Sequence, residues 1–246
     1  MELQKQFTDD CGKYYQASVT TLDFARPSAV TTINDWVARN TNGRIKEIVS
    51  ELTPEEILVL VNAIYFKGSW TEEFDPKLTS AREFYLASGP SQRRMMNRED
   101  RFRYKADDAT QAVALPYGDG RLNMYIFLPR EKDGLGKLID ATKPDNLAEL
   151  FAGFDERKGR VVLPRFKIEF EQNLVKTLQK LGMGLAFAPA ADFSRMVVPP
   201  ATAAISDVLH KTFVEVNEEG TEAAAVTGVK MLATSMPRED ERFSFV

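Results

Sequence analysis

The sequence predicts an α+β protein, because the chain carries both helix patterns and strand patterns, including a β-hairpin. Residues 58–70 form the most apolar run, and both of its faces are apolar, as in a central strand covered on both sides. Residues 112–129 alternate around a Gly118-Asp119-Gly120 turn, which predicts a β-hairpin. Residues 29–49 are expected to be helical with an interruption at Gly43, since one helical face carries Ile33, Trp36 and Val37.

The other elements follow from weaker patterns. In chain order, they are expected as a helix end and turn over residues 1–17, a strand over 17–24, a strand over 95–105, a helix over 131–154, a strand over 161–169 and a helix that ends at Gly182.

The segment after Gly220 has the least usual composition. The strand before it is expected to run up to Gly220, and small residues then continue to about Ser235. With a period of two, the face that would point inward carries no charge: Thr221, Ala223, Ala225, Thr227, Val229, Met231 and Ala233. Both charges, Glu222 and Lys230, lie on the other face. The segment is therefore patterned to enter a sheet, although a helix or an alanine-rich linker also fits its composition.

Composition excludes several classes of function. The chain has 246 residues and a net charge of −4, which gives no electrostatic reason to bind nucleic acid or an anionic membrane. The longest apolar run, residues 57–66, contains Asn62 and is too short to span a bilayer. Cys11 is the single cysteine, so no internal disulfide can form, and with one histidine the usual zinc sites are excluded. We expect neither a cofactor nor a metal, and no signal peptide is visible.

Residues 205–225 closely resemble the strand and hinge of the serpins, serine protease inhibitors whose exposed reactive loop inserts into their main β-sheet. Residues 58–70 are a second match, and residues 33–45 resemble the serpin helix that lies across the front of that sheet. The resemblance covers about residues 13–246. It implies a serpin-like α+β fold, with a large mixed central β-sheet, a second β-sheet, surrounding helices and an exposed reactive loop at about residues 218–242, all in one domain.

The resemblance also implies site residues. The hinge of the reactive loop would be formed by Glu218, Glu219, Gly220, Thr221, Glu222, Ala223, Ala224 and Ala225. Asn62 and His210 would belong to a polar cluster under the centre of the sheet, where strands part to admit the loop, and Trp70 would lie at the top, where insertion begins. By themselves, Asn62 also fits a satisfied buried amide and His210 a core histidine.

The bond that a protease would cut has two candidates. Counting forward from Gly220 by the usual length of the family gives Thr234-Ser235, whereas counting back from Phe245 gives Arg238-Glu239. We prefer Thr234-Ser235, because inhibition depends on the length of the hinge side. The implied partner is a target serine protease, or a cysteine protease. The resemblance also implies an extracellular protein that is a monomer at full length.

The implied activity is that of a suicide substrate, and the chain is not expected to be an enzyme. The alternatives are a non-inhibitory serpin with a chaperone, carrier or storage role, and an inactive fragment. Ser206, Asp207 and His210 could suggest a hydrolase, but members of a catalytic triad normally converge from separate segments.

The chain is shorter than a usual serpin. The N-terminal helices and the C-terminal strand pair of the family have no counterpart in it, so we expect a single partial domain. Because the net stability of a domain is only about 5–15 kcal/mol, we expect the isolated chain to fold poorly or to associate. A cooperative, reversible, monomeric melt would contradict this expectation.

Overall fold

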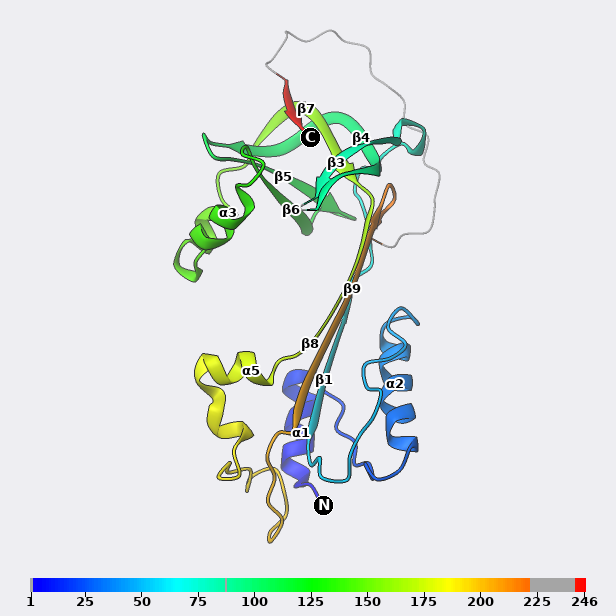
Figure 1. The fold of residues 1–246 in the computed structure, drawn as a ribbon, viewed down its shortest axis with the longest axis vertical. Coiled ribbons are helices and arrows are strands. Elements are labelled where there is room, and N and C mark those ends of the chain that lie inside the picture. The colour runs from blue at the N-terminus through cyan, green and yellow to red at the C-terminus, as the bar shows by residue number, and fades with distance from the viewer. Residues whose placement is uncertain (1, 87, 222–241) are drawn as a thin grey trace. The chain divides into compact units, whose positions relative to one another are not determined.

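A computed structural model describes residues 2–86, 88–221 and 242–246 (Figure 1). The chain forms two compact units. The first contains Met1–Tyr65 and Ile168–Phe213, and the second contains Phe66–Lys167 and Val214–Val246.

The first unit contains most of the helices. Its elements are α1 (Lys5–Tyr15), α2 (Ser28–Asn40), β1 (Val59–Tyr65), most of β8 (Phe166–Asn173), α5 (Val175–Leu178), a π-helical turn η3 (Gln179–Met183), a 3-10 turn η4 (Gly184–Phe187) and the first part of β9 (Asp207–Asn217).

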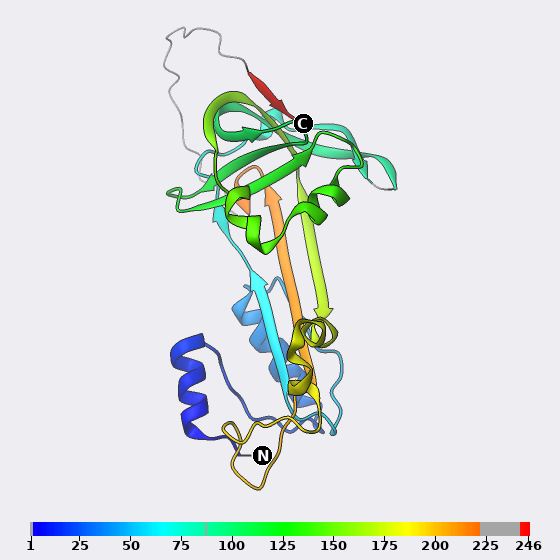
Figure 2. The same ribbon diagram turned by 90° about the vertical axis from the view of Figure 1, so that its left-hand side faces the viewer.

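Within the first unit, β9 lies beside both β1 and β8 (Figures 1 and 2). β1 and β9 pair directly and in parallel, from Val59 opposite Asp207 to Tyr65 opposite Phe213. One face of this pair packs against α2, where Val37 is buried in a cluster with Phe213. The apolar pattern of residues 58–70 therefore does form a strand.

The expectation that both faces of this strand are covered is wrong for the described residues. Burial alternates along β1, and on the face away from α2 the side chains of Leu60 and Ile64 are 40% and 46% exposed. An apolar side chain on a strand indicates that another element could cover that face of the sheet. The sequence pattern does not show whether the covering element is present.

The helix expected over residues 29–49 is shorter than predicted. α2 ends at Asn40, and the chain then turns through Asn42 and Gly43, whose φ angles are +49° and +73°. These left-handed conformations cannot continue an α-helix. Ile45 and Ile48 are nevertheless buried, because the irregular chain after the turn folds back onto α2.

Two predictions near the N-terminus are also wrong. Residues 17–24 form no strand, because they make no ladder of backbone hydrogen bonds with any strand that the structure describes. Residues 1–17 contain an 11-residue helix, α1, that runs through Cys11 and Gly12 instead of ending there. A glycine in a helix interior costs only about 1 kcal/mol relative to alanine, so it need not end the helix.

The second unit is mainly β-structure. Its elements are β2 (Gly68–Ser69), η1 (Pro76–Leu78), β3 (Ser80–Leu86), β4 (Gly89–Ala106), β5 (Thr110–Tyr117), β6 (Leu122–Pro129), α3 (Leu135–Ala141), η2 (Pro144–Asn146), α4 (Leu147–Leu150), β7 (Asp155–Pro164), β10 (Gly220–Thr221) and β11 (Phe243–Phe245).

Six of these strands form one sheet in the order β11-β7-β4-β5-β6, with β3 paired to the first half of β4. The predicted hairpin is confirmed, since β5 and β6 pair antiparallel up to Tyr117 opposite Leu122. The sheet is organised around a buried cluster that includes Met96, Val113 and Val161.

Two long predicted elements are broken in the second unit. The strand expected over residues 161–169 is two strands, because β7 ends at Pro164, which has no N–H to donate, and β8 begins two residues later in the other sheet. The helix expected over residues 131–154 is likewise interrupted between α3 and α4, where Pro144 begins the short turn η2.

Candidate functional site

The segment predicted to form the hinge begins with a tight turn; we keep the name hinge for residues 217–221. β9 ends at Asn217, and after Glu218 and Glu219 the chain reverses, so that β10 pairs antiparallel with β9 and with β2. The side-chain Oδ1 of Asn217 accepts hydrogen bonds from the N–H groups of Glu219 (3.0 Å) and Gly220 (3.2 Å). The strand predicted to run up to Gly220 thus ends three residues earlier, because the asparagine side chain takes over the backbone donors of the turn.

Residues 70–74, which we call the strap, hold the turn from one side. The Trp70 N–H donates to the carbonyl oxygen of Glu219, and the Phe74 N–H donates to that of Glu218, both at 2.9 Å. The indole Nε1–H of Trp70 donates to the carbonyl of Asn217 at 3.0 Å. These three hydrogen bonds fix the position of the turn.

Gly220 lies where the chain approaches β2 most closely. Its φ angle is +146°, and a Cβ added there would lie 2.2 Å from the carbonyl oxygen of Gly68 and 2.7 Å from Cα of Ser69. These are backbone atoms that cannot rotate away, so only glycine fits this position.

Glu218 is the buried charge of the hinge, with only 3% of its surface exposed. Its carboxylate accepts a hydrogen bond from Nε of Arg165 at 2.8 Å and a second one from the hydroxyl of Thr79. Burial alone raises the pKa of this carboxyl, but the hydrogen bonds from Arg165 and Thr79 outweigh burial and bring the pKa below its usual value. Glu218 therefore ties the turn to Thr79, which follows η1, and to Arg165, which follows β7.

This pKa shift predicts a pH dependence of stability. A carboxyl with a depressed folded-state pKa contributes stability fully above its usual pKa of 4.5, and loses it as the pH falls through the folded-state value. We expect Glu218→Gln to lower the free energy of unfolding at pH 7, and the difference from the unmodified chain to shrink below pH 4.5. Urea titrations between pH 3 and 7 measure this difference, with Glu219→Gln as control. A difference that is the same at all pH values would contradict the assignment.

Thr221 is the first residue of the face predicted to point inward, and it is completely buried. Its hydroxyl lies 2.6 Å from the hydroxyl of Tyr117, whose ring stacks on Trp70 with 4.4 Å between ring centroids. Burial raises the pKa of the Tyr117 phenol, so the phenol stays protonated and available for this hydrogen bond.

The other predicted hinge and loop residues cannot be placed. Those that lie outside the described residues are Glu222, Ala223, Ala224, Ala225, Thr234, Ser235, Arg238 and Glu239.

Asn62 and His210 are brought together, since they lie directly opposite each other in β1 and β9. Asn62 is exposed, so the alternative of a satisfied buried amide does not hold for the described structure. His210 is half-buried, its ring meets Phe170 edge-on at 6.2 Å, and its Nδ1 has no hydrogen-bond partner among the described residues. The structure therefore places the two residues of the predicted polar cluster side by side in the first unit, on paired strands.

Sequence reasoning missed the partners that complete the hinge, namely Thr79, Tyr117, Arg165 and Asn217. Only Asn217 carried a usable signal, because asparagine ahead of a glycine is typical of a turn. The other three contact the hinge from 53 to 139 residues away in sequence, and no local pattern selects them.

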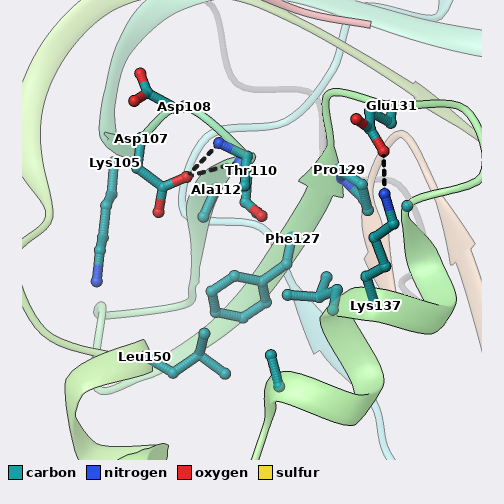
Figure 3. Close-up of a pocket in the computed structure, with 14 residues that line it drawn as sticks. Lys105, Asp107, Asp108, Thr110, Ala112, Phe127, Pro129, Glu131, Lys137 and Leu150 are labelled. Carbon is teal, nitrogen blue, oxygen red and sulfur yellow. Dashed lines mark hydrogen bonds and ion pairs between the residues drawn. The ribbon is translucent and has the colours of Figure 1, made fainter.

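The second unit also contains a cavity of about 530 Å³ between β5, β6, α3 and α4 (Figure 3). Phe127 and Leu150 form its apolar floor. Several charged groups that line it are already paired: Asp107 accepts a hydrogen bond from the Thr110 N–H, and Glu131 forms an ion pair with Lys137 at 2.7 Å. No predicted site residue lines this cavity.

Among the residues that the structure describes, no helix has the length and apolar character needed to cross a membrane. Within those residues, no group of three or more His, Cys, Asp or Glu side chains could hold a metal ion.

Comparison with known sequences gives a consistent result. A family model described as Serpin (serine protease inhibitor) matches residues 1–245. Serpin B6 of Macaca fascicularis is 42% identical over 243 residues, which cover 92% of this chain and 62% of that protein. Serpin-Z7 of Hordeum vulgare is 38% identical over 248 residues, covering 96% and 62%. The chain thus spans about three fifths of the length of these relatives.

Solved structures agree. The native state of Tengpin, a thermophilic serpin, matches with a TM-score of 0.88 and 30% identity, over 98% of this chain and 62% of that one. Thyroxine-binding globulin in complex with thyroxine matches with a TM-score of 0.85 and 26% identity, over 94% and 64%. Uncleaved ovalbumin matches with 0.83 and 29%, over 91% and 62%.

The predicted α+β serpin fold is confirmed by these neighbours. Proteins of this kind are mostly protease inhibitors and not catalytic enzymes, they typically bind target proteases, and they include both extracellular and intracellular members. The family model spans both compact units, and the chain belongs to the serpin family.

Proposed function

We propose that this chain inhibits serine endopeptidases as a suicide substrate. The protease attacks the reactive loop, at Thr234-Ser235 or at Arg238-Glu239, and its serine forms an acyl-enzyme with the residue before the cut. The freed loop then inserts between β1 and β9 and carries the protease with it, so that deacylation stalls. The chain supplies no catalytic group, and an extracellular site of action remains part of this proposal.

The observation that carries the proposal is the register of β10 on β9. Gly220 lies opposite Asn217 and Thr221 opposite Val216, in antiparallel pairing. Extending this register by one residue at a time would lay Ala223 opposite Val214, Ala225 opposite Thr212 and Thr227 opposite His210. In this structure, before any insertion, β1 is the strand paired with this part of β9, with Asn62 opposite His210.

The same register explains the composition of the two faces. Side chains that are paired across antiparallel strands point to the same face, so the uncharged set that begins with Thr221 would share a face with Val214 and Val216. Both of these valines belong to the packed core of the second unit. Glu222 would instead share the other face with Glu215, away from that core. A charge on the inward face would be costly to bury, which fits its absence from the sequence.

The energy for trapping would come from the fold. About a dozen newly paired residues at roughly 1 kcal/mol net for each backbone hydrogen bond give on the order of ten kcal/mol. This is comparable to the stability of a whole domain, so the uncleaved form can be metastable and still folded.

A non-inhibitory role is the second candidate, because thyroxine-binding globulin and ovalbumin, which are among the structural neighbours, are not inhibitors. Under this alternative the loop would be cut but would not insert. The chain also spans only 62% of its first relatives, so the activity of a whole serpin is itself a proposal for this chain.

The test mixes the chain with elastase-like, subtilisin-like and trypsin-like serine proteases and with a cysteine protease. We expect a complex that survives SDS, and sequencing of the released C-terminal peptide decides between Ser235 and Glu239 as its first residue. Ala223→Arg places a charge on the inward face and should give cleavage without complex, whereas Ala224→Arg on the opposite face should still give complex. Cleavage of the unmodified chain with no complex would favour the non-inhibitory role.

A further inference from the structure

The strap is held from two sides. On one side, the N–H groups of Trp70 and Phe74 donate to the turn that carries Glu218 and Glu219. On the other side, Nη1 of Arg98 donates to the main-chain carbonyl of Glu72, which lies between the two donors of the strap. Arg98 belongs to β4, so one side chain connects the middle of the strap to the six-stranded sheet.

The surroundings of Arg98 are unusual for an arginine. Its guanidinium lies over the rings of Phe74 and Phe102, at 5.1 and 4.6 Å from their centroids. Its Nε is buried and has no hydrogen-bond partner among the described residues. Burial lowers the pKa of Arg98 to about 10, with Asp100 acting weakly in the opposite direction. A cation in this position is disfavoured by burial, and an apolar side chain of similar length would fill the same space without that cost.

We propose that Arg98 is a positioning residue for loop insertion: it fixes the strap through Glu72, and the strap in turn keeps β10 in the register from which the inserted strand grows. This inference rests on the proposed function and adds the residue that aligns its first step. Two of the three hydrogen bonds from the strap to the turn come from its main chain, and each requires the backbone near Glu72 to stay in place. Losing the Arg98 contact would release both.

The decisive measurement is hydrogen exchange on the free 246-residue chain, without a protease. Arg98→Met keeps the length and the apolar contacts of the side chain but cannot donate to Glu72. We expect the amides of Trp70 and Phe74 to exchange at least about tenfold faster, because a hydrogen bond from a charged group is lost. Exchange in β5 and β6 should not change. Arg98→Lys, which can still donate, should restore part of the protection.

Arg101→Met is the matched control. Arg101 lies on the same strand, but its side chain is 57% exposed and points to the opposite face. We expect it to leave exchange in the strap unchanged. Faster exchange that is equally large in β5 and β6 would show a general structural role for Arg98 and would overturn the proposal, and so would unchanged exchange at Trp70 and Phe74.

The protease assay then tests the link to insertion. With the strap misplaced, insertion should slow relative to deacylation, so Arg98→Met should raise the ratio of cleaved to complexed chain several-fold over the unmodified chain. An unchanged ratio alongside faster exchange would overturn the positioning role. If the unmodified chain forms no complex at all, the proposed function fails, and with it the positioning role, while the exchange result still decides whether Arg98 holds the strap.

Discussion

Replacing Gly220 by alanine is expected to destabilise the hinge strongly. The new Cβ would lie 2.2 Å from the carbonyl oxygen of Gly68, and the φ angle of +146° is one that side chains of L-residues rarely adopt. Backbone strain costs about 1–3 kcal/mol, and overpacking against a fixed neighbour costs about 1–3 kcal/mol more. We therefore expect the free energy of unfolding of the second unit to fall by roughly 2–6 kcal/mol.

Trp70 reports on this loss directly. A urea titration that follows its fluorescence, in a Trp36→Phe background, reads the second unit alone. Gly118→Ala is the matched control, since Gly118 also has a positive φ of +52° but has no atom within 4 Å of an added Cβ. It should show the strain cost alone, about 1 kcal/mol. Equal effects of the two substitutions would mean that the contact with Gly68 does not matter.

Replacing Glu218 by lysine is expected to have a similarly large effect. Glu218 is almost fully buried and accepts hydrogen bonds from Arg165 and Thr79. Lysine would remove the carboxylate that pairs with Arg165 and would place a second positive charge next to that arginine. Breaking a fully buried ion pair costs about 3–5 kcal/mol, and because the side chain of Arg165 is 42% exposed, the loss should lie near the lower end of this range. We expect a loss of this size in the same urea titration, together with faster cleavage of the turn by added protease.

Two further variants separate the ion pair from a general effect of lysine. Glu219→Lys changes the neighbouring residue, which is half-buried, and should cost less than about 1 kcal/mol. Adding Arg165→Glu to Glu218→Lys reverses the pair and should recover about 1–3 kcal/mol as coupling energy. Additive losses in the double variant would argue that Glu218 and Arg165 do not stabilise each other.

Several elements could be predicted because their signal is local. The hairpin of β5 and β6 depends on alternation and a glycine turn that lie within 20 residues, and both are visible in the chain. β1 was visible as the most apolar run. Residues 17–24 alternate too, but they form no strand, because a strand also needs a neighbour, and alternation says nothing about one.

The boundaries of the longer elements depended on single residues that compete with a regular backbone. Pro164 ends β7 and separates it from β8, although the apolar pattern continues across the break. Asn217 ends β9 through its own side chain, whereas the pattern before Gly220 predicted a continuous strand. Secondary-structure propensities are averaged over several residues and so hide the effect of a single one. They therefore predict the existence of a helix or strand better than they predict the residue where it ends.

The sequence by itself determined that residues 205–225 resemble the strand and hinge of the serpins, and that the face starting at Thr221 carries no charge. These properties depend only on residues that are neighbours in the sequence. Only the tertiary structure decided that Glu218 meets Arg165 and Thr79, that Thr221 meets Tyr117, and that Arg98 holds the strap. Their partners lie 26 to 139 residues away in sequence, and contacts at such separations are selected by the packing of whole strands, which no local pattern contains.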